Sequence, residues 1–420
     1  MKILYVTQIV PYPPHGGVLQ RGYNLLRELG KHHEIHLLAF HHPNELPHGE
    51  PVERSLRELR GFCRTVEYFK LWPKKSPAHM MAALALGALR SDPFSVLAHR
   101  SPALRARLRE LCATPGAFDL VHLDTIALAQ YAGDCGGIPL TLAHHNVESQ
   151  LMARRAERER GFAQRWYVRS QAERLRRLEA RVCRDFVNIM VSDADAETLR
   201  GICPDAHTCV VSNGVDTEYF RPRSGQETPL LVFTGGMGMF ANRDAVHWFI
   251  DEIWPLVRVQ VPEARFAAIG KFPSQHARES AARDPSIEVP GFVDDIRPVV
   301  ARAAIYVVPM RVGGGTRLKV LDAMAQGKAI VSTTLGAEGI DATAGEHFEL
   351  ADDPASFAAC VVKLLRDPTE RARLGAAARK RIEEKYAWSA LGEKLGRIYR
   401  QVTSSVAATQ DQRHGNAETS

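Results

Sequence analysis

The chain has 420 residues, of which 45% are hydrophobic and 24% charged, and its formal net charge is +6. This length predicts two to three domains with large buried cores, and the composition is ordinary for a globular protein. Trp166 and Tyr167 interrupt the main arginine-rich stretch, which has too few aromatic residues for a base-stacking platform, so no nucleic-acid partner is expected.

Cysteine spacing and hydropathy give no sign of a metal, redox or membrane-spanning protein. The seven cysteines are dispersed and none forms a CxxC pair, which is typical of reduced thiols in a cytoplasmic protein. The apolar run at 3–6 is strand-sized and is followed by prolines instead of a cleavage site. The apolar window at 80–89 is shorter than the roughly 20 residues that span a bilayer.

The first half of the chain alternates strand and helix patterns. A strand at 2–6 is followed by a loop ending in Gly16 and Gly17, and then by apolar residues at helical spacing. Further apolar strands are predicted at 34–38, 120–123, 139–143 and 186–191. This alternation favours a parallel, doubly wound α/β sheet.

Arginine is concentrated between residues 154 and 184, where glutamates are interleaved with it. One interpretation is a long solvated helix face with ion pairs between residues i and i+4. The alternative is a basic face directed at anionic lipid headgroups or a phosphorylated acceptor. The sequence leaves both open.

The second half repeats the pattern. A strand at 230–234 leads into glycines and a helix at 243–261. Further strands are predicted at 265–269, 287–289, 305–308 and 329–332, and a helix is predicted at 317–326. Two open α/β sheets in series predict a ligand cleft at the carboxyl ends of the strands, between the domains.

The predicted domains are four segments of the chain. They are an N-terminal domain at 1–208, a C-terminal domain at 209–385, a helix at 386–402 that packs back toward the first domain, and a disordered polar tail at 403–420.

The densest chemical signal lies between a strand and a helix, at Gly313-Gly314-Gly315-Thr316. Glycine-rich backbone at a helix N-terminus can approach a phosphate closely and direct N–H groups at it. Arg317 and Lys319 add positive charge to the first helical turn, where cations oppose the helix dipole, so an anionic ligand explains them better than local stability does. One turn further, Asp322 offers a carboxylate to ribose hydroxyls.

Asp193-Ala194-Asp195 matches a DxD pattern that binds a divalent metal in some enzymes. The same segment follows Ser192 at the start of a predicted helix, where serine and aspartate are favourable caps. The capping interpretation is preferred, and no metal site is predicted.

Several motifs, in order over most of the chain, resemble glycosyltransferase family 4. They are Gly16-Gly17, His145-Asn146-Val147-Glu148, Val211-Ser212-Asn213-Gly214, Gly291-Phe292-Val293-Asp294-Asp295, Asp322-Ala323-Met324-Ala325 and Gly336-Ala337-Glu338-Gly339. The resemblance implies a GT-B fold, in which two Rossmann-like domains with parallel sheets face each other across a cleft. The domain at 1–208 would lie on the acceptor side, and the domain at 209–385 would bind the nucleotide sugar. More narrowly, the chain is similar to sugar transferases of exopolysaccharide biosynthesis clusters.

The resemblance implies a cytoplasmic, metal-independent transferase without a cofactor, peripheral at the inner membrane face. It would move a sugar, with retention of configuration, from a UDP- or GDP-sugar to a glycan or polyprenyl-linked acceptor.

The resemblance also assigns residue roles. Gly16 and Gly17 would approach the diphosphate and acceptor, and His145 or its neighbour His144 would act near the sugar; the alternatives are a plain turn and a buried, hydrogen-bonded histidine. The backbone of Phe292 and Val293 would read the base edge. The remaining donor-binding candidates are Asn242, Arg243, Gly314, Gly315, Thr316, Asp322 and Glu338.

The sequence departs from the family pattern at three places. Gly314 occupies the position of the family's first acidic residue, eight before Asp322. Asp322 itself is one methylene shorter than the usual glutamate, and the Gly-Arg…Lys pair after the first strand of the second domain is missing. We expect Arg317 and Lys319, with Arg243, to supply the positive charge that a diphosphate leaving group requires.

Three other functions remain as alternatives. They are a nucleotide-sugar epimerase, a non-catalytic GT-B assembly partner favoured by Gly314, and a nicotinamide dehydrogenase. The last is disfavoured because Gly235-Gly236-Met237-Gly238 lacks GxGxxG spacing.

Overall fold

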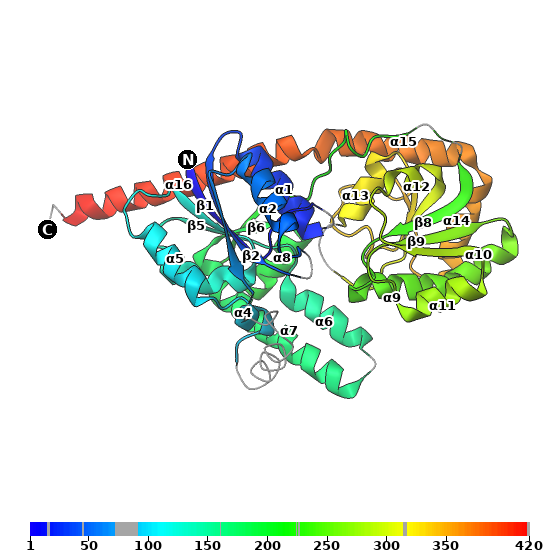
Figure 1. Cartoon of the computed structure of the whole chain (residues 1–420), viewed down its shortest axis with the longest axis horizontal. Coiled ribbons are helices and arrows are strands. Elements are labelled where there is room, and N and C mark those ends of the chain that lie inside the picture. Colours follow the sequence, from blue (N-terminus) through cyan, green and yellow to red (C-terminus); the bar gives the residue numbers. More distant parts are fainter. Residues whose placement is uncertain are drawn as a thin grey trace. The chain divides into compact units, whose positions relative to one another are not determined.

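The computed structural model divides the chain into two compact units (Figure 1), one formed by Met1–Ser212 with Trp388–Ser420 and the other by Asn213–Ala387. It describes the whole chain except residues 15–16, 44–45, 72–90, 160, 224, 226, 314–316 and 418–420, and the side chains of 406–417. The sequence analysis placed the divisions at 208/209 and 385/386. The first lies later because residues 207–210 form a strand of the first unit's sheet.

The first unit is built on a seven-stranded parallel sheet in the order β3-β2-β1-β4-β5-β6-β7. Its central strands are buried on both faces, as apolar runs such as Ile3–Val6 require in a parallel sheet. The strands are β1 (Lys2–Thr7), β2 (Glu34–His41), β3 (Thr65–Lys70), β4 (Leu120–Leu123), β5 (Leu140–Ala143), β6 (Val187–Met190) and β7 (His207–Val210). The order reverses between β1 and β4, where doubly wound sheets bind ligands.

Helices connect these strands, as the alternating pattern predicted. They are α1 (Gly17–Leu29), α2 (Glu50–Arg60), α4 (Phe94–Ala98), α5 (Pro102–Cys112), the 3-10 helix η2 (Ile126–Asp134), α6 (Glu148–Arg158), α7 (Phe162–Val182), the 3-10 helix η3 (Cys183–Asp185), α8 (Asp193–Ile202) and α16 (Trp388–Ala417). The arginine-rich stretch forms the paired helices α6 and α7 (Figure 1). Among the described residues, no helix combines the length and hydropathy needed to cross a membrane.

Helix α16 continues to Ala417, whereas a disordered tail was expected from residue 403. Residues 403–417 contain no proline, so each of them has a backbone N–H to donate within the helix. The difference arises because lack of apolar periodicity was taken as lack of structure.

The second unit contains a six-stranded parallel sheet in the order β10-β9-β8-β11-β12-β13. The strands are β8 (Thr228–Thr234), β9 (Arg265–Ile269), β10 (Ile287–Gly291), β11 (Ala303–Val308), β12 (Ala329–Ser332) and β13 (Glu349–Leu350). The order reverses between β8 and β11, so this unit has the same arrangement of its first four strands as the first unit.

The helices of the second unit are α9 (Phe240–Trp248), the π-helix η4 (Phe249–Ile253), α10 (Trp254–Gln260), α11 (Gln275–Arg283), α12 (Arg297–Arg302), α13 (Leu318–Ala325), α14 (Pro354–Arg366) and α15 (Pro368–Lys385). The single helix expected at 243–261 is therefore interrupted by a π turn. Pro255, in the first turn of α10, has no amide N–H to donate, so the regular α-helical ladder does not continue through this point.

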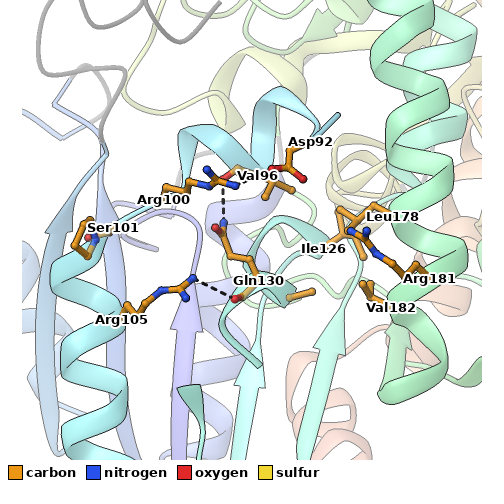
Figure 2. Close-up of a pocket in the computed structure, with 12 residues that line it drawn as sticks. Asp92, Val96, Arg100, Ser101, Arg105, Ile126, Gln130, Leu178, Arg181 and Val182 are labelled. Atoms are coloured by element: carbon orange, nitrogen blue, oxygen red, sulfur yellow. Dashed lines mark hydrogen bonds and ion pairs between the residues drawn. The ribbon is translucent and has the colours of Figure 1, made fainter. Parts of the chain in front are cut away.

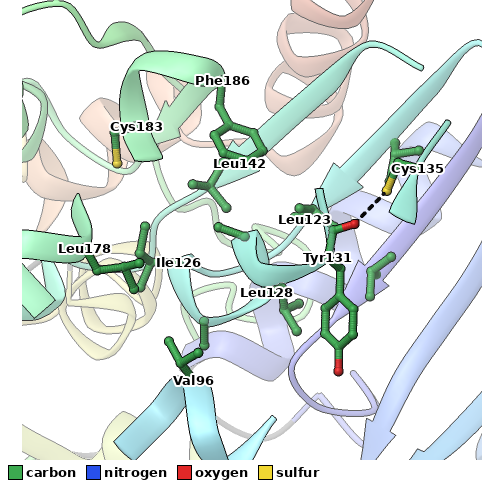
Figure 3. Packing of buried hydrophobic residues seen from close by; sticks show 14 of the residues in the cluster. Val96, Leu123, Ile126, Leu128, Tyr131, Cys135, Leu142, Leu178, Cys183 and Phe186 are labelled. Atoms are coloured by element: carbon green, nitrogen blue, oxygen red, sulfur yellow. Dashed lines mark hydrogen bonds between the residues drawn. The ribbon is translucent and has the colours of Figure 1, made fainter. Parts of the chain in front are cut away.

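A hydrophobic cluster fixes η2 beside the sheet of the first unit (Figure 3). Leu123 of β4 and Leu142 of β5 pack with Ile126 and Tyr131 of η2 and with Leu178 of α7. All five side chains are at least nine-tenths buried, and removing an apolar side chain of this size from water stabilises the fold by roughly 1.5–3 kcal/mol. This packing holds the chain immediately after β4 in one place.

Candidate active site

The carboxyl ends of β8 and β11 bring Lys319 and Asn242 together at the strand reversal of the second unit. The Lys319 Nζ donates a hydrogen bond of 2.6 Å to Asn242 Oδ1, and Asn242 Nδ2 donates one of 3.0 Å to the carbonyl of Gly236. The Lys319 ammonium also lies 4.1 Å from the centroid of the Phe233 ring. Two residues predicted separately for the donor site thus contact each other.

Glycine is required at one position within the loop after β8 and at a second position that packs against this loop. Gly235 has a φ of 150°, and a Cβ there would lie 2.7 Å from Lys319 Nζ. A Cβ on Gly270, which follows β9, would lie 2.0 Å from the carbonyl oxygen of Gly235. The loop therefore lies directly against the lysine, with no space for larger residues at these points.

The charge of Lys319 is not neutralised within its surroundings. Among the described residues, its hydrogen-bonding partner is the uncharged Asn242 amide, and no carboxylate lies within ion-pair distance. Burial, and secondarily the nearby Arg317 guanidinium, lower the pKa of Lys319 to about 7. A partly buried amine with a lowered pKa and no acidic partner is a typical feature of a site that binds an anion.

Arg317 is the residue immediately before α13 and adds a second cation to this edge. Its side chain lies against Gly313, whose φ is 130° and where a Cβ would be 2.8 Å from Arg317 Nη2. Arg317 Nη2 is 4.0 Å from Glu338 Oε2, so the structure brings these two predicted site residues together.

Asp322 lies deeper than a ribose contact requires. Asp322 is buried on α13. Burial is the main cause of the raised pKa of Tyr306, and the negative charge of the Asp322 carboxylate raises it further. The Tyr306 hydroxyl is hydrogen-bonded to the Thr234 hydroxyl beneath the loop. A ribose contact by Asp322 stays a prediction.

The other donor-site candidates in this unit are placed less directly. Arg243 lies partly exposed, with its guanidinium 5.6 Å from the Phe240 ring centroid. Phe292 is 47% exposed after β10, and Lys271 Nζ lies 5.1 Å from its ring centroid. Val293 is partly exposed. The sequence analysis did not single out Lys271, although a lysine directly after a strand and a glycine is a visible signal.

Four predicted residues fall outside the described part of the chain. They are Gly16, Gly314, Gly315 and Thr316. Gly17 is the first residue of α1, at the carboxyl end of β1.

In the first unit, His145 is paired with a carboxylate that the sequence analysis missed. His145 Nε2 lies 3.2 Å from Asp124 Oδ1, and the two side chains are 7% and 3% exposed. Asp124 follows β4 and His145 follows β5, two neighbouring strands. The signal for Asp124 was its position directly after a buried strand, but aspartate after a strand is common and does not by itself indicate a site.

His144 is the buried, hydrogen-bonded histidine of the pair. Its Nε2 lies 3.0 Å from Asn188 Oδ1 of β6, and burial lowers the pKa of His144 to about 4. His144 is therefore held neutral inside the sheet, which leaves His145 as the candidate for a chemical role.

A second buried charge lies near Asp124. The Arg21 guanidinium of α1 is 2% exposed and donates hydrogen bonds to the carbonyls of Val211 and Ser212, at 2.9 and 3.0 Å. Burial lowers the pKa of Arg21, and the Tyr5 hydroxyl and Asp124 carboxylate act in the opposite direction. The carboxyl edge of this sheet therefore holds an acid, an imidazole and a guanidinium.

Asp193 and Asp195 lie in the first turn of α8. The Ser192 hydroxyl accepts a hydrogen bond from the Asp195 amide and donates one to its carboxylate. This is the capping arrangement that the sequence predicted. Within the described ranges, no three histidine, cysteine, aspartate or glutamate residues are grouped so as to hold a metal ion.

Two doubly wound parallel units in one chain, each with polar side chains at the carboxyl edge of its sheet, define a GT-B fold. The structure of Anabaena HepE, in complex with UDP and glucose, supports this class: it is 15% identical and aligns with a TM-score of 0.68 over 96% of this chain and all of that one.

Family models match both units. The Glycosyltransferase Family 4 model matches residues 15–219, and the Glycosyl transferases group 1 model matches 228–367. The chain belongs to the family 4 glycosyltransferases.

Curated relatives are more distant. A D-inositol 3-phosphate glycosyltransferase of Thermomonospora curvata is 27% identical over 79% of this chain and 84% of its own length. An uncharacterized protein in the cps region of Klebsiella pneumoniae is 24% identical over 37% of this chain. A GDP-mannose-dependent phosphatidylinositol monomannoside mannosyltransferase of Corynebacterium glutamicum is 24% identical over 44% of this chain. The chain spans 42% and 54% of the lengths of the last two.

Proposed function

We propose that this protein transfers a sugar from a nucleoside diphosphate sugar to an acceptor hydroxyl, and that the second unit binds the donor diphosphate. The observation that carries this proposal is the partly buried Lys319 ammonium, which has an amide partner and a neighbouring guanidinium but no carboxylate within ion-pair distance among the described residues. A site built this way favours an anion with at least two charges.

The same two cations supply the chemistry of the leaving group. As the glycosidic bond breaks, negative charge accumulates on the diphosphate, and positive groups already fixed near it lower the barrier. Lys319 and Arg317 take this role in place of the family's missing Gly-Arg…Lys pair. We therefore propose a metal-independent reaction that, as in the family resembled, retains the anomeric configuration.

In the first unit, we assign His145 to the sugar-transfer step. The Asp124 carboxylate lies 3.2 Å from its Nε2, close enough to stabilise a positive charge that develops on the imidazole ring. We also assign the other described donor-site candidates to donor binding, as the resemblance implies. They are Gly17, Asn242, Arg243, Phe292, Val293 and Glu338.

For the substrates, we propose a UDP- or GDP-sugar and a glycan or polyprenyl-linked acceptor in exopolysaccharide assembly at the inner membrane face. The complex of Anabaena HepE with UDP and glucose and the GDP-mannose dependence of the Corynebacterium mannosyltransferase support a nucleotide-linked donor, and the cps region of the Klebsiella protein supports this pathway. The basic α6 and α7 suit a protein that works beside anionic lipids.

Thermal shift with UDP, GDP, ADP, TDP and their sugars, with and without EDTA, tests the donor site. We expect a shift with one diphosphate that survives EDTA and disappears in Lys319→Ala. Lys363→Ala is the matched control, because Lys363 is an exposed lysine of the same unit that pairs with Glu349. A shift that needs a divalent metal, or that Lys319→Ala retains, contradicts the proposal.

One observation favours a second function. Gly314 stands at the position of the family's first acidic residue, and Asp322 is one methylene shorter than the family's usual glutamate at the second, so both acidic positions differ from the family pattern. If no nucleotide or nucleotide sugar shifts the melting temperature, a non-catalytic assembly role becomes the better interpretation.

A further inference from the structure

The first unit contains a pocket of about 510 Å³ that none of the predicted site residues lines (Figure 2). It lies among α4, α5, η2 and α7. Its volume is within the range of roughly 300–1,000 Å³ that is typical of small-molecule sites. The pocket is therefore large enough for a ligand and lies outside the donor site of the second unit.

The pocket is cationic. Arg100 and Arg105 lie on one side and Arg181 of α7 lies on the other (Figure 2), whereas the acidic lining consists of Asp92. Arg100 Nη2 is 2.7 Å from Asp92 Oδ2, which leaves an excess of two positive charges among the lining side chains.

Two of the three arginines differ in how they are held. Arg105 Nε lies 3.5 Å from Oδ2 of Asp134, whose side chain is 4% exposed, so a buried carboxylate holds the Arg105 guanidinium in position. Arg181 has no hydrogen bond or ion pair to another described residue. Guanidinium groups on opposite sides of one pocket can bind the separate oxygens of a phosphate.

The remaining wall is apolar. Val96, Ile126 and Leu178 line the pocket and also belong to the hydrophobic cluster beneath it (Figure 3). An inorganic anion gains nothing from such a wall, because its hydration is lost without compensation. An anionic group attached to a hydrocarbon chain can interact with both the arginine side chains and the apolar wall of the pocket.

The pocket and the candidate residues of the first unit depend on the same strand end. Asp124, which holds His145, follows β4, and Ile126 of the pocket comes two residues later as the first residue of η2. A ligand in the pocket would therefore be anchored by the same segment that positions the candidate histidine.

We propose that this pocket binds the acceptor through a phosphate or diphosphate monoester of a long-chain alcohol. Arg100, Arg105 and Arg181 bind the phosphate oxygens, and the first carbons of the chain pack on the apolar wall. The identity of the ligand as the acceptor rests on the proposed function; the binding chemistry rests on the pocket alone.

Isothermal titration of the full-length protein with geranyl diphosphate, inorganic diphosphate and geraniol tests the binding chemistry. Saturating UDP is present, and the titration is repeated in Lys319→Ala, so that the donor site does not account for the heat. We expect geranyl diphosphate to bind about tenfold or more tightly than either of its parts.

Arg181→Ala should weaken geranyl diphosphate binding by about tenfold, the loss expected for one charge-assisted hydrogen bond to a phosphate. The matched control is Arg177→Ala, one turn earlier on the same helix, where the guanidinium pairs with Glu173 at 3.0 Å outside the pocket. It should change the affinity by less than about twofold. Arg100→Ala provides a second, independent pocket variant.

The outcomes separate this proposal from the proposed function. Absence of geranyl diphosphate binding, or equal affinity in the wild type, Arg181→Ala and Arg100→Ala, would overturn the pocket assignment. Equal affinity for inorganic and geranyl diphosphate would also overturn it, because the site would then bind free phosphate. Arg181-dependent binding of geranyl diphosphate in a protein that binds no nucleotide supports the pocket while the donor proposal fails.

Discussion

The Lys319 ammonium and the Asn242 side-chain amide are joined by a hydrogen bond of 2.6 Å, although 77 residues separate them in the chain. The bond links the helix after β11 to the helix after β8, across the point where the strand order reverses. An amide satisfies the geometry of the ammonium without neutralising its charge, so the site keeps an unused positive charge for a ligand.

Lys319→Met should separate stability from binding. Burying an ammonium without a counter-ion is costly, so its replacement by an apolar side chain of similar length should leave the free energy of unfolding at pH 7 unchanged or raise it. Nucleoside diphosphate affinity should fall by about tenfold or more. Denaturant titration and calorimetry measure the two quantities. A loss of stability together with retained binding would show that the lysine is structural.

The affinity for the nucleoside diphosphate should fall as the pH rises above about 7. The Lys319 pKa of about 7 means that the free protein loses the ammonium proton above this pH, whereas the bound diphosphate favours the protonated form. Binding at pH 8 should take up a proton, with a decrease in affinity of up to about tenfold per pH unit. Calorimetry in buffers of different ionisation enthalpy measures the uptake, which Lys319→Met should abolish.

The same pKa has a consequence for folding. Since the unfolded chain keeps the lysine proton to higher pH than the folded chain, it binds more protons above about pH 7. The free energy of unfolding of the wild type should therefore rise with pH between 7 and 9 relative to that of Lys319→Met. Parallel curves for the two proteins would contradict the lowered pKa.

Asp124→Asn should lower the turnover of sugar transfer and leave donor binding intact. The Asp124 carboxylate lies 3.2 Å from the His145 imidazole. Loss of a group that supports a proton-transferring residue in this way costs about 10–100-fold in rate. The nucleotide-induced thermal shift should persist, because that site is in the other unit. Asp119→Asn, an exposed aspartate that bonds the Lys2 amide, is the control. Equal activity of both variants would remove Asp124 from the site.

Acid should destabilise the protein through its buried histidines. The pKa of His144 is lowered to about 4 from the ordinary 6.5, so the unfolded state binds more protons in this interval and stability falls as the pH drops from 6.5 toward 4. Each such histidine contributes up to about 1.4 kcal/mol per pH unit. His144→Gln should therefore show a shallower loss between pH 7 and 5 than the wild type. His32→Gln, an exposed histidine, should match the wild-type slope.

Gly270→Ala should damage the donor loop. The added Cβ would lie 2.0 Å from the Gly235 carbonyl oxygen, so the backbone must move at a cost of roughly 1–3 kcal/mol, and nucleotide affinity should fall as well. Gly201→Ala is the contrasting variant, since a Cβ there has nothing within 4 Å in helix α8. It should stabilise the protein by roughly 0.5–1 kcal/mol. Similar effects of the two substitutions would argue against a tightly packed loop.

Much of the fold could be predicted because buried parallel strands leave a strong signal. The strands at 120–123, 265–269 and 329–332 have the bounds that the apolar runs indicated. Strand β7 was missed because its residues, His207–Val210, are only partly buried and read as part of the connection between domains. The order of the strands depends on long-range pairing, which local patterns do not encode.

The site was predictable where residue type and position coincided. Arg317 and Lys319 were identified because cations at the start of a helix oppose the helix dipole and so do not stabilise the helix. Asp124 and Arg21 were not, because a single charged residue after a strand or inside a helix has many ordinary explanations. Their burial, which distinguishes them, is a property of the assembled sheet.

The return of α16 to the first unit makes that unit the last to be completed during protein synthesis. Its residues at the start of the chain pair with ones near the end: the Tyr399 hydroxyl lies 2.9 Å from His122 Nδ1, and Gly392 lies where a Cβ would meet Glu28. The ribosome therefore releases a finished second unit, Asn213–Ala387, before the first can close over its own core. A nascent chain arrested at residue 212 should therefore lack the Tyr399 hydroxyl that contacts His122 in the complete chain.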